Sequence, residues 1–162
     1  ESFYKHPKIW IIRIQKMRWE QRIVCSFDDR KNSAGMKTLQ IVISTTDNLN
    51  ELKYLQGILA SSLINFWCIN YLADDMNQSY LEKIPIRVIN YENKEDKTIH
   101  DILVALVERM IDLNKKLLKA RTPHDRELIE RQIMVTDNEI DSLVYRLYNL
   151  TEDEIKIVEG TR

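Results

Sequence analysis

The sequence predicts an α+β fold, with a small strand-rich unit and its packed helix followed by an antiparallel hairpin of two long helices. Three short runs rich in β-branched and aromatic residues lie within the first 45 positions, an uncharged stretch follows, and two heptad repeats span residues 99–147. Strands that precede helices, rather than alternating with them, are typical of the α+β class. With Gly 3 and Pro 3 in 162 residues, a turn-rich β-sandwich and a disordered chain are disfavoured. We expect an α+β unit over residues 1–90 and a helical unit over 95–162.

Three strands are expected at the start of the chain. Residues 9–15, 22–28 and 38–45 are short apolar runs that charged or turn-forming residues bound, which favours strands over helices. Between the second and the third run, residues 28–35 hold several turn formers and predict a polar loop.

A long buried helix is expected next, over about residues 51–72, with Asn48 or Asn50 as its N-cap. Residues 54–73 carry no charge over 20 positions, a length that can span a bilayer. Polar side chains interrupt this stretch, so a buried helix is favoured over a membrane span. A loop over residues 74–80 and a strand over 81–89 should follow, and Pro85 suits an edge strand.

Beyond a charged linker at residues 90–97, the pattern changes to heptads. The first apolar seam, with the 4-3 spacing of a coiled coil, consists of Ile99, Leu103, Leu106, Met110, Leu113 and Leu117. The second seam has the same spacing and consists of Ile129, Ile133, Thr136, Ile140, Leu143 and Leu147. Thr122 is the expected N-cap of the second helix, with Pro123 at its first position. The two seams should face each other across an antiparallel hairpin.

A capping box, Thr151-x-x-Glu154, predicts a final short helix over residues 152–159. The tripeptide Glu154-Ile155-Lys156 resembles part of the acid/Glu-x-Lys pattern of metal-dependent nucleases. It follows a cap rather than lying on a strand, and a match of three residues arises often by chance. We therefore expect no catalytic role for it.

Several classes of function are disfavoured by what the sequence lacks. Its three glycines are too far apart for a phosphate-binding loop, so a P-loop and a dinucleotide fingerprint are both excluded. Cys25 and Cys68 form no metal-binding pair and read as reduced cysteines of a cytoplasmic protein. No nucleophile and base can be paired, and no metal site is expected. Since the chain starts with Glu1 rather than Met, we expect it to be a piece of a longer protein.

Charge is strongly segregated along the chain, although the formal net charge is only -1. Residues 1–40 contain nine bases and four acids, a net charge of +5. Residues 41–91 carry -2 and residues 92–162 carry -4. A basic end beside an acidic end suggests that the first part meets an anionic partner while the second stays solvated.

The basic part interleaves tryptophans with cations, starting at Trp10 and Arg13 and ending at Arg22. Lysine and arginine can neutralise phosphates, and arginine can grip guanine edges. The alternative, equally weighted from composition, is a solvated hairpin whose tryptophans belong to the core. With the polar loops included, the candidate DNA-binding residues are Arg13, Lys16, Arg18, Arg22, Arg30, Lys31, Asn32, Lys37, Asn77 and Gln78.

Three segments resemble the C-terminal target-recognition region of TaqI-like adenine-specific DNA methyltransferases and of fused type II restriction–modification enzymes. They are residues 54–67 (YLQGILASSLINFW), 81–86 (LEKIPI) and 139–159 (EIDSLVYRLYNLTEDEIKIVE). The most specific part is the family's Asp-x-Leu-Val-Tyr-x-Leu-Tyr motif, which is matched here by Asp141, Leu143, Val144, Tyr145, Leu147 and Tyr148. Two departures are Ala60, where the family often has Asn, and residues 87–93, which replace a proline-rich run.

This resemblance implies recognition of double-stranded DNA on behalf of a covalently linked methyltransferase or nuclease domain. The family's catalytic residues and its S-adenosylmethionine site lie upstream of this region, so the chain itself is expected to be non-catalytic and to hold no cofactor. The helices would serve as a spacer or as a dock for that domain or another subunit. No membrane association is expected.

Two other functions remain open. The paired heptads also fit a protein–protein interaction or spacer module that makes no DNA contact. A transcription regulator ranks lower, because the sequence lacks a short helix-turn-helix signature.

Overall fold

The computed structural model describes residues 5–13, 23–29, 35, 37–71 and 77–160. Within them, three strands form one antiparallel sheet in the order β2-β1-β3, with β1 (Lys8–Ile12) between β2 (Cys25–Asp28) and β3 (Leu39–Ile43). In this register, Trp10 on the central strand lies opposite Ser26 on one side and Ile41 on the other. The three predicted strands are therefore confirmed, each shorter than the apolar run that predicts it.

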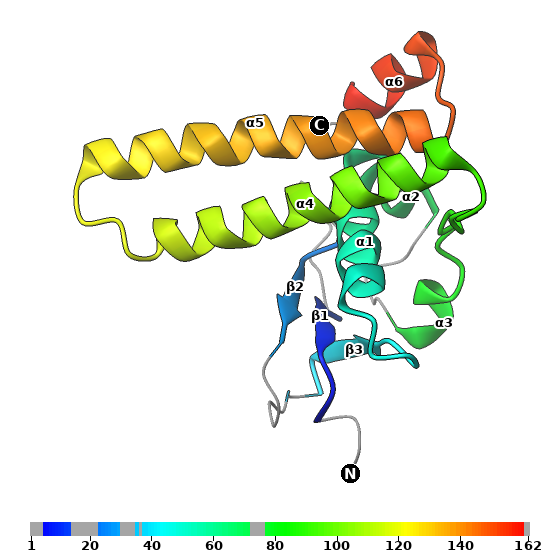
Figure 1. The fold of residues 1–162 in the computed structure, drawn as a ribbon, viewed down its shortest axis with the longest axis horizontal. Coiled ribbons are helices and arrows are strands. Elements are labelled where there is room, and N and C mark those ends of the chain that lie inside the picture. Colours follow the sequence, from blue (N-terminus) through cyan, green and yellow to red (C-terminus); the bar gives the residue numbers. More distant parts are fainter. Residues whose placement is uncertain (1–4, 14–22, 30–34, 36, 72–76, 161–162) are drawn as a thin grey trace.

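Six helices follow the sheet in the described part of the chain, and the α+β class is confirmed. They are α1 (Leu49–Ala60), α2 (Ser62–Tyr71), α3 (Gln78–Leu81), α4 (Lys94–Leu117), α5 (Pro123–Leu147) and α6 (Glu152–Glu159). Figure 1 shows α4 and α5 side by side as a long arm, with α1 running from the arm down to the sheet. The sheet thus lies beneath one half of the arm, and the turn between α4 and α5 projects away from it.

The single helix predicted over residues 51–72 is wrong, because the chain breaks at Ser61. Ser61 has extended backbone angles (φ -70°, ψ 154°), which end α1 and begin α2. The N-cap of α1 is Asn48, whose side chain accepts from the backbone N–H groups of Asn50 and Glu51. Of the two residues predicted as the N-cap, Asn48 is therefore confirmed.

The strand predicted over residues 81–89 is also wrong. Leu81 ends the one-turn helix α3, and no strand forms between Ile84 and Asn90. Tyrosine hydroxyls take the place of a neighbouring strand, because Tyr148 Oη donates to Pro85 O at 2.7 Å and accepts from Arg87 N at 2.9 Å. The preceding loop is shorter than predicted, since α3 starts at Gln78, and the linker is shorter too, since α4 starts at Lys94.

The long helices form as the heptads and caps predict. Thr122 Oγ1 accepts from Asp125 N at 3.0 Å with Pro123 in the first turn, and the capping box of Thr151 and Glu154 is complete. The buried face of α4 is wider than its predicted seam, however, because it also includes Val104 and Val107, and α4 packs against α1 as well as against α5. The two long helices pack against each other as predicted, and the contact of α4 with α1 is an addition that the seams do not predict.

Gly57 lies in the contact between α1 and α4. A Cβ atom at this position would lie 2.9 Å from Val107 Cγ2 and 3.0 Å from Leu103 Cδ1. The first separation is shorter than real Cβ contacts show and the second is tighter than most of them, so a side chain at position 57 would require Val107 and Leu103 to shift. One buried cluster runs from Ile9 and Ile11 in the sheet, through α1, to Val144 in α5. The division into units 1–90 and 95–162 stays a prediction.

Candidate nucleic-acid interface

Four of the ten predicted DNA-binding residues lie in the described part of the chain: Arg13, Lys37, Asn77 and Gln78. The other six lie outside the described residues, and they are Lys16, Arg18, Arg22, Arg30, Lys31 and Asn32.

Arg13 and Lys37 come together at one end of the sheet. Arg13 directly follows β1, and its backbone N–H donates to Thr38 O at 2.8 Å. Lys37 is exposed in the turn that enters β3. β2 begins at the same end, where Ile12 N donates to Val24 O at 3.0 Å. This end of the sheet therefore carries both described cations of the predicted DNA-binding face.

Trp10 is held in the sheet by its own side-chain contacts. Its indole Nε1 donates to Asp28 Oδ2 at 3.0 Å, and Lys8 Nζ lies 5.7 Å from the centre of its ring. Gly35 lies against the ring so closely that a Cβ there would fall 2.2 Å from it. Lys8 and Asp28 are both buried. Trp10 thus has the packing role that the alternative interpretation gives to the tryptophans.

Asn77 and Gln78 both use their side chains within α3. Asn77 Oδ1 accepts from Ser79 Oγ at 2.6 Å and from Tyr80 N at 3.3 Å, which makes it the N-cap. Gln78 Nε2 donates to Glu82 Oε1 at 2.9 Å. The amide groups that are predicted to read base edges therefore already have partners inside the protein, and their contact with DNA stays a prediction.

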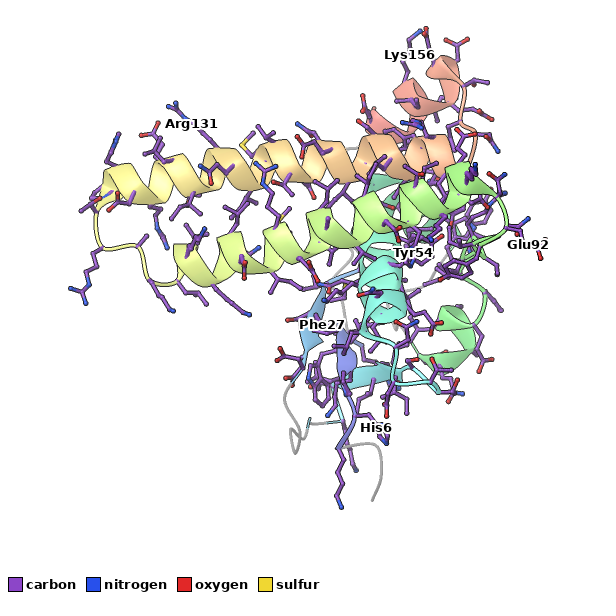
Figure 2. All side chains as sticks on the ribbon, viewed as in Figure 1. His6, Phe27, Tyr54, Glu92, Arg131 and Lys156 are labelled. Atoms are coloured by element: carbon purple, nitrogen blue, oxygen red, sulfur yellow. The ribbon has the colours of Figure 1, made fainter. Side chains whose placement is uncertain are left out.

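A set of hydrogen bonds, buried at Ser62 and Asp141 and more exposed at the tyrosines, joins the three segments that carry the family resemblance. The carboxylate of Asp141 on α5 accepts from Ser62 N and from Ser62 Oγ, both at 2.7 Å, and so caps α2 from outside. Tyr148 binds the extended chain at Pro85 and Arg87, as described above, and Tyr54 Oη donates to Arg87 O at 2.7 Å. We call Ser62, Asp141, Tyr54 and Tyr148 the clasp. Figure 2 shows Tyr54 where α1 meets α4.

The clasp residues were not singled out as functional by sequence reasoning, although all four lie in the segments that carry the resemblance. Serine beside a helix break and an aspartate far along the chain give no local signal that they meet. Their role is structural, because the side chains of Asp141, Tyr54 and Tyr148 bind backbone groups that no helix or strand partner satisfies.

Burial raises the pKa of both clasp tyrosines above the ordinary value for a phenol. The folded state therefore keeps these protons at a pH where the unfolded chain, with tyrosine pKa values of about 10, releases them. Because the unfolded state then binds fewer protons, the free energy of unfolding should fall as the pH rises above about 10. Urea unfolding at pH 8 and pH 11 measures this loss. Between the two pH values, the free energy of unfolding should fall less in the Y54F/Y148F variant than in the unchanged chain. An equal fall in both proteins would show that groups other than these tyrosines cause the pH dependence.

Two further groups with shifted pKa values, Cys25 and Glu154, have environments that indicate a structural role rather than a catalytic one. Desolvation raises the pKa of the Cys25 thiol to about 12, so this group stays protonated and is a poor nucleophile at neutral pH. Hydrogen bonds from the Thr151 backbone and hydroxyl lower the pKa of Glu154. Lys156 Nζ meanwhile donates to Asp153 at 2.9 Å. Both polar residues of the nuclease-like tripeptide are thus engaged within α6.

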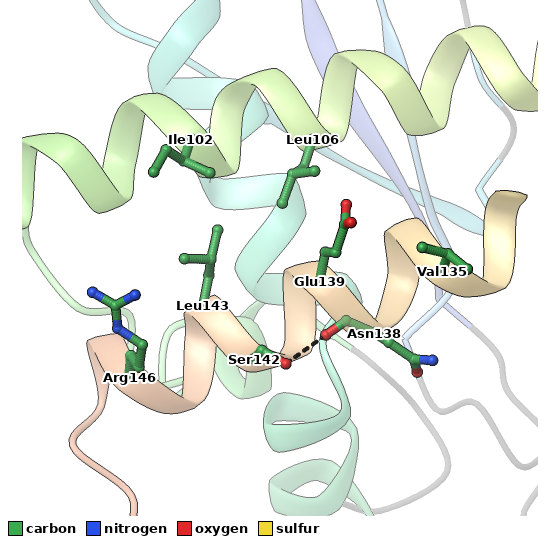
Figure 3. Close-up of a pocket in the computed structure, with 8 residues that line it drawn as sticks. All are labelled: Ile102, Leu106, Val135, Asn138, Glu139, Ser142, Leu143 and Arg146. Atoms are coloured by element: carbon green, nitrogen blue, oxygen red, sulfur yellow. Dashed lines mark hydrogen bonds between the residues drawn. The ribbon is translucent and has the colours of Figure 1, made fainter.

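An apolar groove of about 490 Å³ lies between α4 and α5. Figure 3 shows Ile102 and Leu106 on one wall, with Leu143 and Val135 on the other. Ile102 is 44% exposed and Val135 51% exposed. Its charged rim is internally paired, since Arg109 donates to Glu139 at 3.3 Å and Arg146 lies 3.8 Å from Glu95.

The described residues contain no group of three or more histidine, cysteine or acidic side chains placed to hold a metal ion. No helix among them is both long enough and apolar enough to cross a membrane.

Comparison with known proteins gives one informative similarity, whereas no family model matches the chain. Over 150 residues the chain is 31% identical to a protein of Methanocaldococcus jannaschii whose name describes a type II restriction enzyme and methyltransferase. The aligned segment covers 90% of this chain but only 11% of that much longer relative. The chain is therefore similar, over most of its length, to one segment of a restriction–modification protein.

Proposed function

We propose that this chain recognises a DNA target sequence on behalf of a DNA adenine methyltransferase or a restriction–modification enzyme. The observation that carries the proposal is the similarity to a restriction–modification protein over 90% of the chain. The +5 charge of residues 1–40 supports it, because the phosphate backbone attracts a locally basic surface.

In this proposal the partners are double-stranded DNA and a covalently linked methyltransferase or nuclease domain. Arginine and lysine side chains at the Arg13 and Lys37 end of the sheet would contact phosphates, and loop residues would contact base edges. Catalysis and the methyl donor S-adenosylmethionine belong to the linked domain. The chain itself contributes binding and orientation.

The test is duplex binding by the 162-residue chain, measured by fluorescence anisotropy with a labelled 40-base-pair duplex at 50 and 200 mM NaCl. We expect binding that weakens steeply with salt. The variant carrying Arg13→Gln, Arg18→Gln and Arg22→Gln should lower the slope of log K against log [salt] by about 2.7, since each phosphate contact contributes about 0.9.

A matched control removes three arginines from the helical arm. Arg109→Gln, Arg131→Gln and Arg146→Gln change the net charge equally, but each of these arginines is exposed and has a carboxylate within 4 Å. The control variant should bind within about twofold of the unchanged chain, because exposed ion pairs contribute little. No binding by the unchanged chain at 50 mM NaCl would contradict the proposal, as would equal losses in both variants.

A second candidate function, protein–protein interaction, is favoured by the exposed apolar groove between α4 and α5. The occupant would be a second copy of the chain, which would pair its groove with its partner's as in a four-helix arrangement. Sedimentation velocity at rising concentration should then show a dimer, and Val135→Glu should return it to a monomer. A monomer at every concentration would contradict this function and leave DNA recognition untouched.

A further inference from the structure

The tip of the helical arm, residues 114–126, is a basic patch within a part of the chain that is otherwise acidic. These residues hold five bases and one acid, a net charge of +4. The remainder of residues 92–162 holds seven bases and fifteen acids, a net charge of -8. The tip therefore differs sharply in charge from the arm that carries it.

Four cations of the tip have no carboxylate partner within 4 Å among the described residues. They are Lys115, Lys116, Lys119 and Arg121, and all four are exposed. Other arginines of the arm are paired, as Arg131 is with Glu127 and Arg146 with Glu95. Figure 2 shows Arg131 on the outer face of α5. Uncompensated cations thus collect at the tip, where the arm's own acids do not neutralise them.

The helix dipole explains only part of this patch. Lys115 and Lys116 lie in the last turn of α4, where a cation is favourable. Lys119 lies beyond the end of that helix. Arg121 directly precedes the N-cap Thr122 and Arg126 follows shortly after it, and a cation beside a helix N-terminus is unfavourable. Helix stability therefore does not account for the cations on the α5 side of the turn.

The tip is also concave. A hollow of about 540 Å³ is lined by Lys116, Lys119 and Arg121, with apolar side chains of α5 at its base. The acid that lines it, Asp125, accepts from the Thr122 hydroxyl at 2.6 Å and serves the helix cap. Three cations around a hollow, with the local acid already engaged, form a surface suited to an extended anion.

The tip lies to one side of the sheet, in a position to reach a partner that the sheet also contacts. Val107 lies in the α1–α4 contact, and ten residues at 1.5 Å each place Leu117, the last residue of α4, roughly 15 Å along the arm, with Lys119 beyond it. A second hollow, of about 290 Å³, is lined by both Asp29, which directly follows β2, and Lys115 on α4. That hollow also contains acids, of which Glu108 pairs with Lys53. Asp29 directly precedes the predicted DNA-binding residues Arg30, Lys31 and Asn32.

We propose that the tip of the arm binds the sugar–phosphate backbone of duplex DNA, beside the segment that the strand-rich unit contacts. The inference rests on the proposed function, because it gives the same DNA a second point of attachment. Lysines act as point charges and reach phosphates without reading bases. The tip therefore adds affinity that does not depend on sequence, and it requires a duplex long enough to reach from the sheet to the tip.

The experiment compares the variant Lys116→Gln, Lys119→Gln, Arg121→Gln with the arm control Arg109→Gln, Arg131→Gln, Arg146→Gln. Anisotropy is measured with labelled 40- and 12-base-pair duplexes of mixed sequence between 50 and 200 mM NaCl. On the long duplex, the tip variant should lose about tenfold in affinity and about 2.7 in salt slope. On the short duplex, the loss should be less than twofold. The control should match the unchanged chain on both.

The outcomes separate this inference from the proposed function. If the tip variant binds both duplexes like the unchanged chain while the variant at Arg13, Arg18 and Arg22 loses binding, the tip inference is wrong and DNA recognition stands. If the unchanged chain binds neither duplex at 50 mM NaCl, the proposed function fails and the tip has no DNA to bind. A lower midpoint of thermal unfolding in the tip variant, without a change in DNA affinity, would assign the tip cations to helix stability and overturn the inference.

Discussion

Replacing Asp141 with alanine should lower the free energy of unfolding by about 2–4 kcal/mol. Its carboxylate accepts two hydrogen bonds from Ser62, both at 2.7 Å, in a site where Asp141 is only 5% exposed and Ser62 only 9% exposed. Alanine would leave the Ser62 N–H and hydroxyl buried without these acceptors, at the positive end of α2. The loss of the charge-assisted hydrogen bonds and the loss of a negative charge beside the positive end of the α2 dipole both lower the free energy of unfolding.

Urea unfolding followed by circular dichroism measures this loss. Ser62→Ala keeps the backbone bond and should lose about 1 kcal/mol, while Asp112→Ala removes an exposed acid of α4 and should stay within about 0.5 kcal/mol of the unchanged chain. Equal stability of the Asp141 and Asp112 variants would mean that the clasp contributes nothing to folding.

Replacing Gly57 with leucine should cost about 1–3 kcal/mol, because the side chain would be forced between α1 and α4. Its first atom alone would lie 2.9 Å from Val107 and 3.0 Å from Leu103. Gly57→Ala should cost less, since alanine gains about 1 kcal/mol of helix propensity that offsets part of the crowding.

The control for this change is Ala105→Leu, a small-to-large substitution at an exposed position of α4. It should leave the urea midpoint nearly unchanged, because the added side chain meets solvent. If Gly57→Leu is as stable as the control, the close approach of the two helices does not depend on glycine.

The elements that sequence reasoning found are those whose signals are local. The N-caps Asn48, Thr122 and Thr151 each bind backbone groups two or three residues away, so the residue type and its position suffice. The heptads likewise specify helices by spacing alone. Caps and heptads depend on the local sequence of a segment and do not depend on which other element packs against it.

The elements that sequence reasoning missed depend on contacts with residues that are distant in the sequence. The break at Ser61 is stabilised by Asp141, whose carboxylate caps α2 from 79 positions along the chain. The extended segment at Pro85 and Arg87 looks like a strand by composition, yet its hydrogen bonds go to Tyr148 and Tyr54 rather than to a neighbouring strand. Neither partner can be inferred from periodicity.

The candidate site shows the same division. The +5 charge of the first 40 residues is readable from sequence, but the roles of Trp10 in packing and of Asn77 in capping are not. The net charge of -4 over residues 92–162 does not reveal the basic tip, because the sum combines the +4 charge of the tip with the -8 charge of the residues on either side. Only the hairpin geometry separates the tip in space from the rest of the arm.

The bond between Ser62 and Asp141 has a consequence for the order of events during synthesis. The first turn of α2 obtains its cap from a residue that the ribosome adds 79 positions later, and α1 packs on an α4 that is also still to come. The strand-rich half therefore leaves the ribosome before α4 and α5. Its α1 and α2 cannot complete their packing, and their apolar faces stay exposed, until most of α5 has left the exit tunnel. We therefore expect the strand-rich half to expose apolar surface, and to be prone to aggregation, until the residues that pack on it have been synthesised.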